Sequence, residues 1–202
     1  MHYEVVFFDI GGVVVDVESD RLMLQLAQTT GKTLDEVQQA VYHKELMVPF
    51  ETGHLSPKQY YAGLKEKLSL PWSYEQFEKI WSAIFTENKD VTVIMERLRK
   101  WHRLCALSNT NVLHVDWLKK NIPSLTLLFH EWVTSCDAGF RKPDPRIYEA
   151  ALKQLGVRAH QVIYVDDRPE LVDAARSLGI QSIRFESSQQ LEHDLQAIGL
   201  NL

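Results

Sequence analysis

The stretch FFDIGGVVVD, residues 7–16, decides how this chain is interpreted. It opens as an apolar run, places one carboxylate at Asp9, and continues with two glycines and a second apolar run. A short, continuous apolar run is typical of a strand buried inside a parallel sheet. Glycine after such a strand allows the backbone to approach a ligand closely. The stretch therefore predicts a buried strand that ends in a carboxylate at a functional site.

Other short apolar runs predict the rest of a sheet. Buried parallel strands are expected at residues 3–9, 103–108, 161–166 and 181–185, with a weaker one at 131–135. Helical patterns separate them, and three have clear starts: Asp90 before 91–101, Asp144-Pro145 before 145–155, and Pro169. Strands alternating with helices predict an α/β fold, a parallel sheet with helices on both faces.

Residues 16–88 break this alternation, because they show helical patterns and no convincing strand. Thr33 with Glu36, and Ser73 with Gln76, have the spacing of capping boxes, and Ser56-Pro57 is a helix start. Aromatic residues at helical spacing, Tyr60, Tyr61, Phe77 and Trp81, are expected in the core of this part. We therefore expect a small all-helical cap at 16–88, inserted after the first strand of a core formed by 1–15 and 89–202.

Composition narrows the class of protein. The 202 residues carry 27 acidic and 22 basic side chains without a dense basic cluster, so nucleic acid is not expected as a partner. No signal peptide and no apolar run long enough to span a membrane is evident, so we expect a cytoplasmic protein without a membrane partner. Cys105 and Cys136 do not have the spacing of a metal site and are expected as reduced thiols.

Polar residues follow the predicted strands where ligands of open parallel sheets bind, at the carboxyl ends. They are Asp9, then Ser108 with Asn109, then Asp166 with Asp167, and Lys142 lies in a loop before a helix. Three carboxylates in one place repel each other and favour a bound cation, and hard oxygen ligands favour Mg²⁺. A carboxylate, Mg²⁺, a hydroxyl and a lysine suit phosphoryl transfer, with Asp9 attacking phosphorus.

With these residues in this order, the chain resembles the haloacid dehalogenase superfamily of aspartate-nucleophile phosphatases along its whole length. LSNTNVLHVDW (107–117), FRKPDPRIYEAAL (140–152) and YVDDRPELVDAARSLGI (164–180) are similar to the subgroup that contains bacterial alpha-D-glucose-1-phosphate phosphatases. The resemblance implies a Rossmann-like core with a small helical cap. It also implies roles for individual residues: Asp9 as nucleophile and Mg²⁺ ligand, Gly11 as a carbonyl ligand, Asp167 as a metal ligand, Asp166 as the acid that orients a metal-bound water, Ser108 and Lys142 as the phosphate clamp, and Asn109 in the adjoining loop.

Position 11 departs from the pattern of the superfamily. Most of its phosphatases carry an aspartate there, which acts as general acid and base, whereas this chain has Gly11, as the resembling subgroup also tolerates. Water, Glu18 or a residue of the cap are alternatives for that role. Within the cap, residues 42–54 could face the site, and their polar or aromatic side chains are His43, Glu45, Phe50, Glu51 and His54.

The leading interpretation is a Mg²⁺-dependent phosphatase that acts on small phosphorylated metabolites, with sugar phosphates such as glucose 1-phosphate favoured. Gly11 leaves open a degenerate protein that binds a phosphorylated ligand or partner without efficient turnover. A 2-haloacid dehalogenase is a further alternative; Tyr148 invites it, and the pair Asp166-Asp167 speaks against it, because adjacent acids without a cation are costly. A monomer or weak homodimer is expected.

Overall fold

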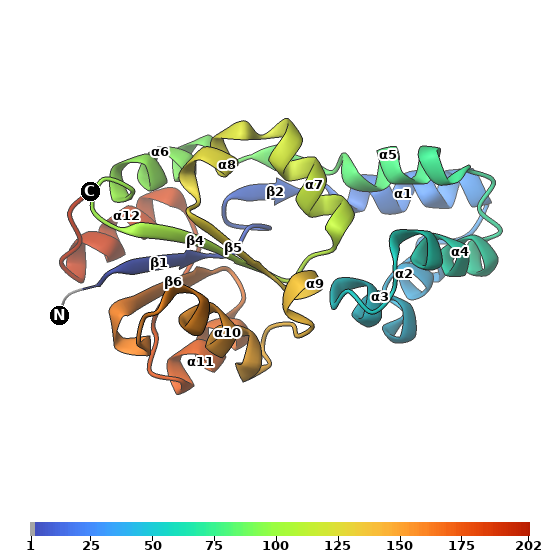
Figure 1. Cartoon of the computed structure of the whole chain (residues 1–202). Coiled ribbons are helices and arrows are strands. Elements are labelled where there is room, and N and C mark those ends of the chain that lie inside the picture. Colours follow the sequence, from blue (N-terminus) through green and yellow to red (C-terminus); the bar gives the residue numbers. More distant parts are fainter. Residues whose placement is uncertain (1–2) are drawn as a thin grey trace.

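A computed structural model describes residues 3–202, and its centre is a five-stranded parallel sheet with the order β5-β4-β1-β6-β7 (Figure 1). The strands are β1 Val5–Phe8, β4 Arg103–Ser108, β5 Glu131–Thr134, β6 Val162–Asp166 and β7 Gln181–Arg184. All four pairs of neighbours are parallel. The predicted α/β fold is confirmed, and each of the five expected strands is present within its predicted range, the weaker one included.

The strand β1 occupies the middle of the sheet, between β4 and β6. Phe8 is the register partner of Ala106 in β4 and of Val165 in β6. All four residues of β1 are fully buried, because helices cover both faces of the sheet. This burial is the reason why β1 is a continuous apolar run, and it places the next residue, Asp9, at the carboxyl edge of the sheet.

Two layers of helices cover the sheet (Figure 1). One apolar core lies under α6 Lys89–Leu98, α7 Val112–Asn121, α8 Pro123–Leu128 and α12 Ser188–Ala197. A second lies under α10 Pro145–Leu155 and α11 Pro169–Ser177 on the opposite face. Two short elements complete this part, α9 Ser135–Ala138 and the 3₁₀ turn Ala159–Gln161. No helix in residues 3–202 has both the length and the apolarity needed to cross a membrane.

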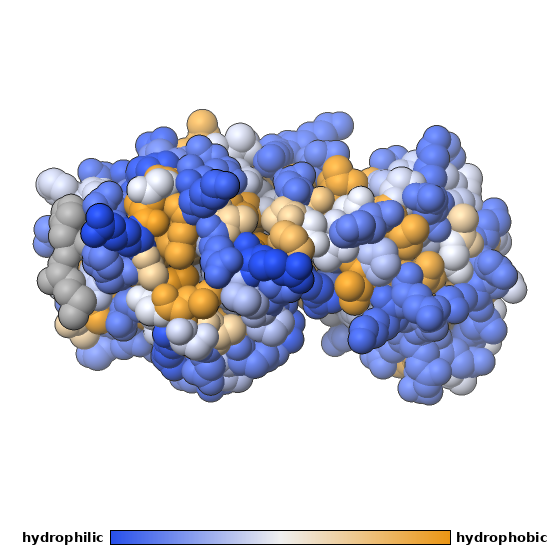
Figure 2. Space-filling view, turned by 60° about the horizontal axis from the view of Figure 1, so that its bottom comes forward, coloured by the Kyte–Doolittle hydropathy of each residue, from blue (hydrophilic) through white to orange (hydrophobic). Residues whose placement is uncertain are grey.

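Five helices form a separate lobe with its own apolar core. A narrower waist joins this lobe to the part of the molecule that contains the sheet (Figure 2). The five helices are α1 Ser19–Thr30, α2 Leu34–Val41, α3 Lys44–Glu51, α4 Pro57–Leu68 and α5 Tyr74–Ser82. The capping boxes predicted at Thr33 and Ser73 are both present, and Ser56 also caps its helix. Tyr60, Phe77 and Trp81 are buried in this core as predicted, whereas Tyr61 is only partly buried against it. Phe50 also belongs to the core and stacks on Tyr60 at 4.3 Å between ring centroids. The ranges 16–88 and 1–15 with 89–202 remain our proposed division.

Two details of the sequence prediction are wrong. An antiparallel ribbon, β2 Val15–Val17 with β3 Phe85–Glu87, joins the helical lobe to the core where no strand was expected. Strands of three residues are too short to show an apolar period. The helix α6 ends at Leu98 rather than at 101, and Asn88, not Asp90, caps it, because the Asn88 side chain accepts a hydrogen bond from the Val91 amide. Asp90 instead lies in the first turn.

His114 of α7 forms the joint between core and cap beside this ribbon. Its ring stacks on Trp81 of α5 at 5.7 Å and meets the edge of Phe85 at 4.9 Å. Nε2 lies 3.2 Å from the Trp81 carbonyl oxygen, and Nδ1 lies 3.0 Å from Asn111 Nδ2. The Asn111 amide donates to Nδ1 and Nε2–H donates to the carbonyl, so this geometry holds a neutral imidazole. Burial lowers the pKa of His114 to about 4.

Lowering the pH should therefore destabilise the protein through His114. The unfolded chain takes up this proton near pH 6.5, whereas the folded chain resists it down to about 4, so the stabilisation is complete above pH 6.5 and is lost as the pH falls towards 4. At pH 5 the loss should be about 2 kcal/mol. We would measure the free energy of unfolding in urea at pH 7.5 and 5.0 for the wild type and His114→Gln. The same pH dependence in both proteins would contradict the assignment.

Candidate active site

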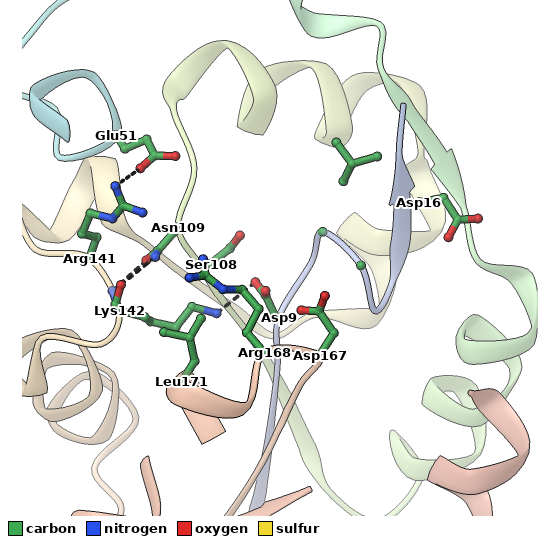
Figure 3. Close-up of a pocket in the computed structure, with 13 residues that line it drawn as sticks. Asp9, Asp16, Glu51, Ser108, Asn109, Arg141, Lys142, Asp167, Arg168 and Leu171 are labelled. Atoms are coloured by element: carbon green, nitrogen blue, oxygen red, sulfur yellow. Dashed lines mark hydrogen bonds and ion pairs between the residues drawn. The ribbon is translucent and has the colours of Figure 1, made fainter. Parts of the chain in front are cut away.

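The polar residues predicted at the strand ends meet around one pocket of about 470 Å³ (Figure 3). Its lining includes six of the seven predicted site residues, which are Asp9, Gly11, Ser108, Asn109, Lys142 and Asp167. The seventh, Asp166, is fully buried and does not line the pocket, but it contacts two lining residues, Lys142 and Arg168. The structure thus brings together residues from the carboxyl ends of β1, β4 and β6 and from the loop before α10.

Asp9 is held with one oxygen engaged and the other free. Oδ1 accepts a hydrogen bond of 2.8 Å from the amide of Ile10 and lies 3.0 Å from Lys142 Nζ. Within residues 3–202, Oδ2 accepts no hydrogen bond. The pKa of Asp9 is raised to about 6. Burial is the main cause and the Asp166 charge adds to it, while Lys142 opposes both. A fixed carboxylate with one free oxygen is suited to act as a nucleophile towards a ligand in the pocket.

Lys142 is 1% exposed, and its ammonium group is fully engaged. Nζ donates to the Leu107 carbonyl oxygen at 2.8 Å and to Asp166 Oδ2 at 2.7 Å, and its third neighbour is Asp9 Oδ1. A buried ammonium group is tolerated only with such a complete set of partners. Lys142 therefore fixes the orientation of the Asp9 carboxylate and balances part of its charge.

Asn109 links two loops of the site. Its side-chain Nδ2 donates to the Lys142 carbonyl oxygen at 2.8 Å, and its Oδ1 accepts from the Lys142 amide at 2.7 Å. Both polar atoms of the side chain are thus committed to the backbone of Lys142. Contact between Asn109 and a phosphate would have to come from its backbone amide, while its side chain positions Lys142. Ser108 lies beside it at the end of β4, is 4% exposed and lines the pocket.

Asp9, Asp166 and Asp167 each offer a carboxylate oxygen within 4.8 Å of the other two. Burial and the charge of Asp166 raise the pKa values of both Asp9 and Asp167, so the cluster lacks compensating charge. A divalent cation with oxygen ligands would relieve this repulsion, and the residues present therefore fit Mg²⁺.

Asp166 and Asp167 differ in how many of their carboxylate oxygens are free to bind a metal. Asp166 Oδ2 accepts from Lys142 and from the Tyr164 hydroxyl, and Oδ1 accepts from the Arg168 amide at 2.9 Å. Asp167 is only half-buried and lines the pocket. The geometry favours Asp9 and Asp167 as direct ligands, with Asp166 behind them.

A side chain at position 11 and a side chain at position 12 would meet different neighbours. Gly12 has a φ of +80°, and a Cβ there would lie 2.7 Å from Asp167 Oδ2, so a side chain would collide with the candidate metal ligand. At Gly11 a Cβ would lie 3.1 Å from Val17 Cγ2 of the ribbon, which is tight but open to adjustment. Glycine at position 12 is therefore required by close approach, whereas position 11 is limited by one flexible neighbour.

Of the groups considered as substitutes for an acid at position 11, the structure places one in the pocket. Glu18 is tied to Arg21 and Thr86 and does not line it. Phe50 is in the core of the cap, and His43, Glu45 and His54 lie outside the pocket. Glu51, at the end of α3, lines it and lies 2.8 Å from Arg141. Burial raises the pKa of Glu51, while Arg141 and Arg168 lower it.

Sequence reasoning missed several residues of the lining, which are Gly12, Asp16, Val17, Arg141, Arg168 and Leu171. Arg141 directly precedes Lys142 and Arg168 directly follows Asp167. This adjacency to predicted site residues could have indicated that both arginines reach the pocket. Tyr148, considered because of the dehalogenase alternative, is fully buried and donates to the Leu171 carbonyl oxygen at 3.0 Å. It does not line the pocket and serves packing.

Comparisons with known proteins agree with this arrangement. D-ribitol-5-phosphate phosphatase from Bacteroides thetaiotaomicron is 25% identical over 205 residues, covering 96% of this chain and 97% of that protein. A HAD-like family hydrolase from Porphyromonas gingivalis superposes with a TM-score of 0.85 at 20% identity, with all of both chains covered. The HAD family enzyme BT-2542 from B. thetaiotaomicron, in complex with magnesium and inorganic phosphate, superposes with a TM-score of 0.79 at 20% identity over 91% of this chain and 94% of that one.

The family comparison covers most of the sequence. Residues 3–179 match the family described as haloacid dehalogenase-like hydrolase, a range that includes every residue of the pocket. The predicted superfamily is therefore confirmed, and the match does not extend to the glucose-1-phosphatase subgroup. With a matching sequence, a matching fold and the acids of the strand ends gathered in one pocket, this chain belongs to the haloacid dehalogenase-like hydrolases.

Proposed function

We propose that this hydrolase is a Mg²⁺-dependent phosphatase that acts on small phosphorylated metabolites through an aspartyl-phosphate on Asp9. The observation that carries the proposal is the position of Asp9, which stands at the end of the central strand with one free oxygen, among three clustered acids and against a buried lysine. The relatives named for phosphatase activity, and the magnesium and phosphate bound in a protein of the same fold, support it.

The residues would act in two steps. The free oxygen Oδ2 of Asp9 attacks phosphorus, a new P–O bond forms, and the ester P–O bond breaks, so the leaving group departs as an alkoxide that takes its proton from water. A water molecule then attacks phosphorus, which releases inorganic phosphate and restores the carboxylate. Ser108 would bind a phosphoryl oxygen, and Lys142, whose ammonium group is already engaged, would supply positive charge beside the phosphoryl group. Mg²⁺ held by Asp9, Asp167 and the carbonyl of Gly11 would supply positive charge to the phosphoryl group.

Two alternatives are weaker on the same observations. A 2-haloacid dehalogenase has no use for three acids clustered around a cation site, and Tyr148 does not reach the pocket. A protein without turnover is motivated only by the missing carboxyl group at Gly11. Among phosphatase substrates we favour sugar phosphates, including glucose 1-phosphate, whose anomeric oxygen is a better leaving group than an ordinary alkoxide. The cytoplasmic location and the monomer or weak homodimer stay predictions.

Asp9→Asn should abolish hydrolysis, by about 10⁴-fold or more in kcat, because the amide is a poor nucleophile. Its Oδ1 can still accept from Ile10 and Lys142, so the fold should survive, which circular dichroism and urea unfolding would show. We would measure release of p-nitrophenol from its phosphate ester at saturating Mg²⁺. The control is Asp90→Asn, an exposed carboxyl in α6, taken through the same purification. Equal activity in both variants would exclude Asp9 as the nucleophile.

The two acids after β6 should respond differently to Mg²⁺. Asp167→Asn removes a candidate ligand, and we expect the Mg²⁺ concentration for half-maximal activity to rise more than 100-fold. Asp166→Asn removes a group behind the ligands, and about 10- to 100-fold is expected. Chelation should abolish activity in the wild type. Mg²⁺ titrations of both variants check the order, and an unchanged Mg²⁺ requirement in Asp167→Asn would contradict the ligand assignment.

The absence of a carboxyl group at Gly11 should make the rate depend steeply on the acidity of the leaving group. Aryl and anomeric sugar phosphates should be hydrolysed far better than primary alkyl phosphates of similar size. Gly11→Asp should then accelerate the poor leaving groups by about 10²- to 10⁴-fold. Because Val17 limits the space, the double variant Gly11→Asp with Val17→Ala belongs in the same series, and Val17→Ala alone is its control. A shallow dependence in the wild type would mean that another residue already donates the proton.

A further inference from the structure

We propose that Glu51 of the cap and Arg141 of the core together bind the hydroxyl groups of the leaving group, so that the enzyme selects polyol and sugar phosphates over plain alkyl phosphates. The inference rests on the proposed phosphatase function and names the two residues that would recognise the part of the substrate that departs.

Glu51 and Arg141 meet on one side of the pocket, Glu51 from the cap and Arg141 from the core. Glu51 is the last residue of α3, and Arg141 directly precedes Lys142 in the loop before α10. Arg141 Nη1 lies 2.8 Å from Glu51 Oε2, and both side chains line the pocket that contains Asp9 (Figure 3). In that view they stand across the pocket from Asp16 and Asp167. The pair is therefore placed where cap and core enclose the part of a substrate that lies beyond its phosphate.

The pair has hydrogen-bonding capacity that the protein does not use. Glu51 Oε2 is buried against Arg141 in the ion pair, whereas Oε1 accepts no hydrogen bond in the part of the chain that the structure describes. Within residues 3–202 the guanidinium group of Arg141 donates no hydrogen bond either, and its side chain remains 32% exposed. Buried polar groups in folded proteins are normally hydrogen-bonded. A hydroxyl group can donate to Glu51 Oε1 and accept from the Arg141 guanidinium group at once, and so suits both side chains.

The charges on this side of the pocket favour an uncharged leaving group. The Glu51 carboxylate offsets Arg141, and the nearby Arg168 is paired with Glu170. A second phosphate or a carboxylate on the substrate would need an arginine that is not already neutralised, and it would approach Glu51, a like charge. Hydroxyl groups carry no such penalty.

A purely mechanical role, fastening the cap to the core, is already served by a neighbouring contact. At Gly53 a Cβ would lie 2.3 Å from the Cys136 carbonyl oxygen, so the turn after α3 lies directly against α9. This contact is made by backbone and lies outside the pocket lining. The ion pair in the pocket is thus available for recognition.

The test compares ribitol 5-phosphate with n-pentyl phosphate, which has the same chain length and no hydroxyl groups. For the wild type, Glu51→Gln and Arg141→Met, we would measure kcat/KM for both esters with the full chain and Mg²⁺. Matched controls are Glu45→Gln, an exposed carboxyl on the same helix, and Arg146→Met, an exposed arginine five residues after Arg141. We expect the ratio of kcat/KM for ribitol 5-phosphate to that for pentyl phosphate to fall about 10-fold or more in the two pocket variants, and to stay at the wild-type ratio in both controls.

Two results would overturn the inference. If both esters lose activity together in Glu51→Gln and Arg141→Met, the pair only holds the cap in place. If the wild type prefers 3-phosphoglycerate to ribitol 5-phosphate, the site recognises a second anion. If the wild type hydrolyses none of the esters, nor p-nitrophenyl phosphate, the phosphatase function fails by itself. In that case binding of the two esters to the Asp9→Asn variant, by calorimetry, still decides whether Glu51 and Arg141 discriminate between them.

Discussion

The buried ammonium group of Lys142 is the interaction on which the rest of this site depends. It contacts the Leu107 carbonyl oxygen in β4, Asp9 after β1 and Asp166 at the end of β6. These three strands are neighbours in the sheet, so one cation ties together the edge from which the site is built. Removing one partner from such a buried group is costly, because the remaining charge loses its compensation. The contacts that orient the Asp9 carboxylate are therefore also ones that the fold cannot lose singly without cost.

Charge balance then explains why the pocket suits both a metal and a phosphate. Lys142 offsets one of the three clustered carboxylates, so two negative charges stay uncompensated; burial first, and the charge of Asp166 in addition, raise the pKa values of Asp9 and Asp167. A divalent cation would complete the balance and leave the free oxygen of Asp9 ionised. Without it, the charge that favours the metal would repel a phosphate.

The sequence predicted those features that local pattern determines. Asp9, Ser108 and Asp166 each end a buried strand, so strand prediction and site prediction were one inference, and the capping boxes placed the helices of the cap. The ribbon β2–β3 was missed because its strands are too short to show a period. The contact of Glu51 with Arg141 could not be predicted, because it joins residues far apart in sequence and depends on how the cap sits on the core.

The loop after β1 connects Asp9 directly to the ribbon that joins the cap to the core. Asp9 and the ribbon strand β2 are separated by only five residues, and this short loop is braced by the Gly12 amide, which donates to the Val15 carbonyl oxygen at 2.8 Å. The loop is further confined by Asp167, which excludes a side chain at position 12. The backbone that carries Asp9 therefore continues within a few residues into the ribbon that leads to the cap. Because no long linker separates them, a cap residue such as Glu51 can keep a constant position relative to Asp9. One pocket is thus lined both by residues at the strand ends and by a residue of the helical lobe.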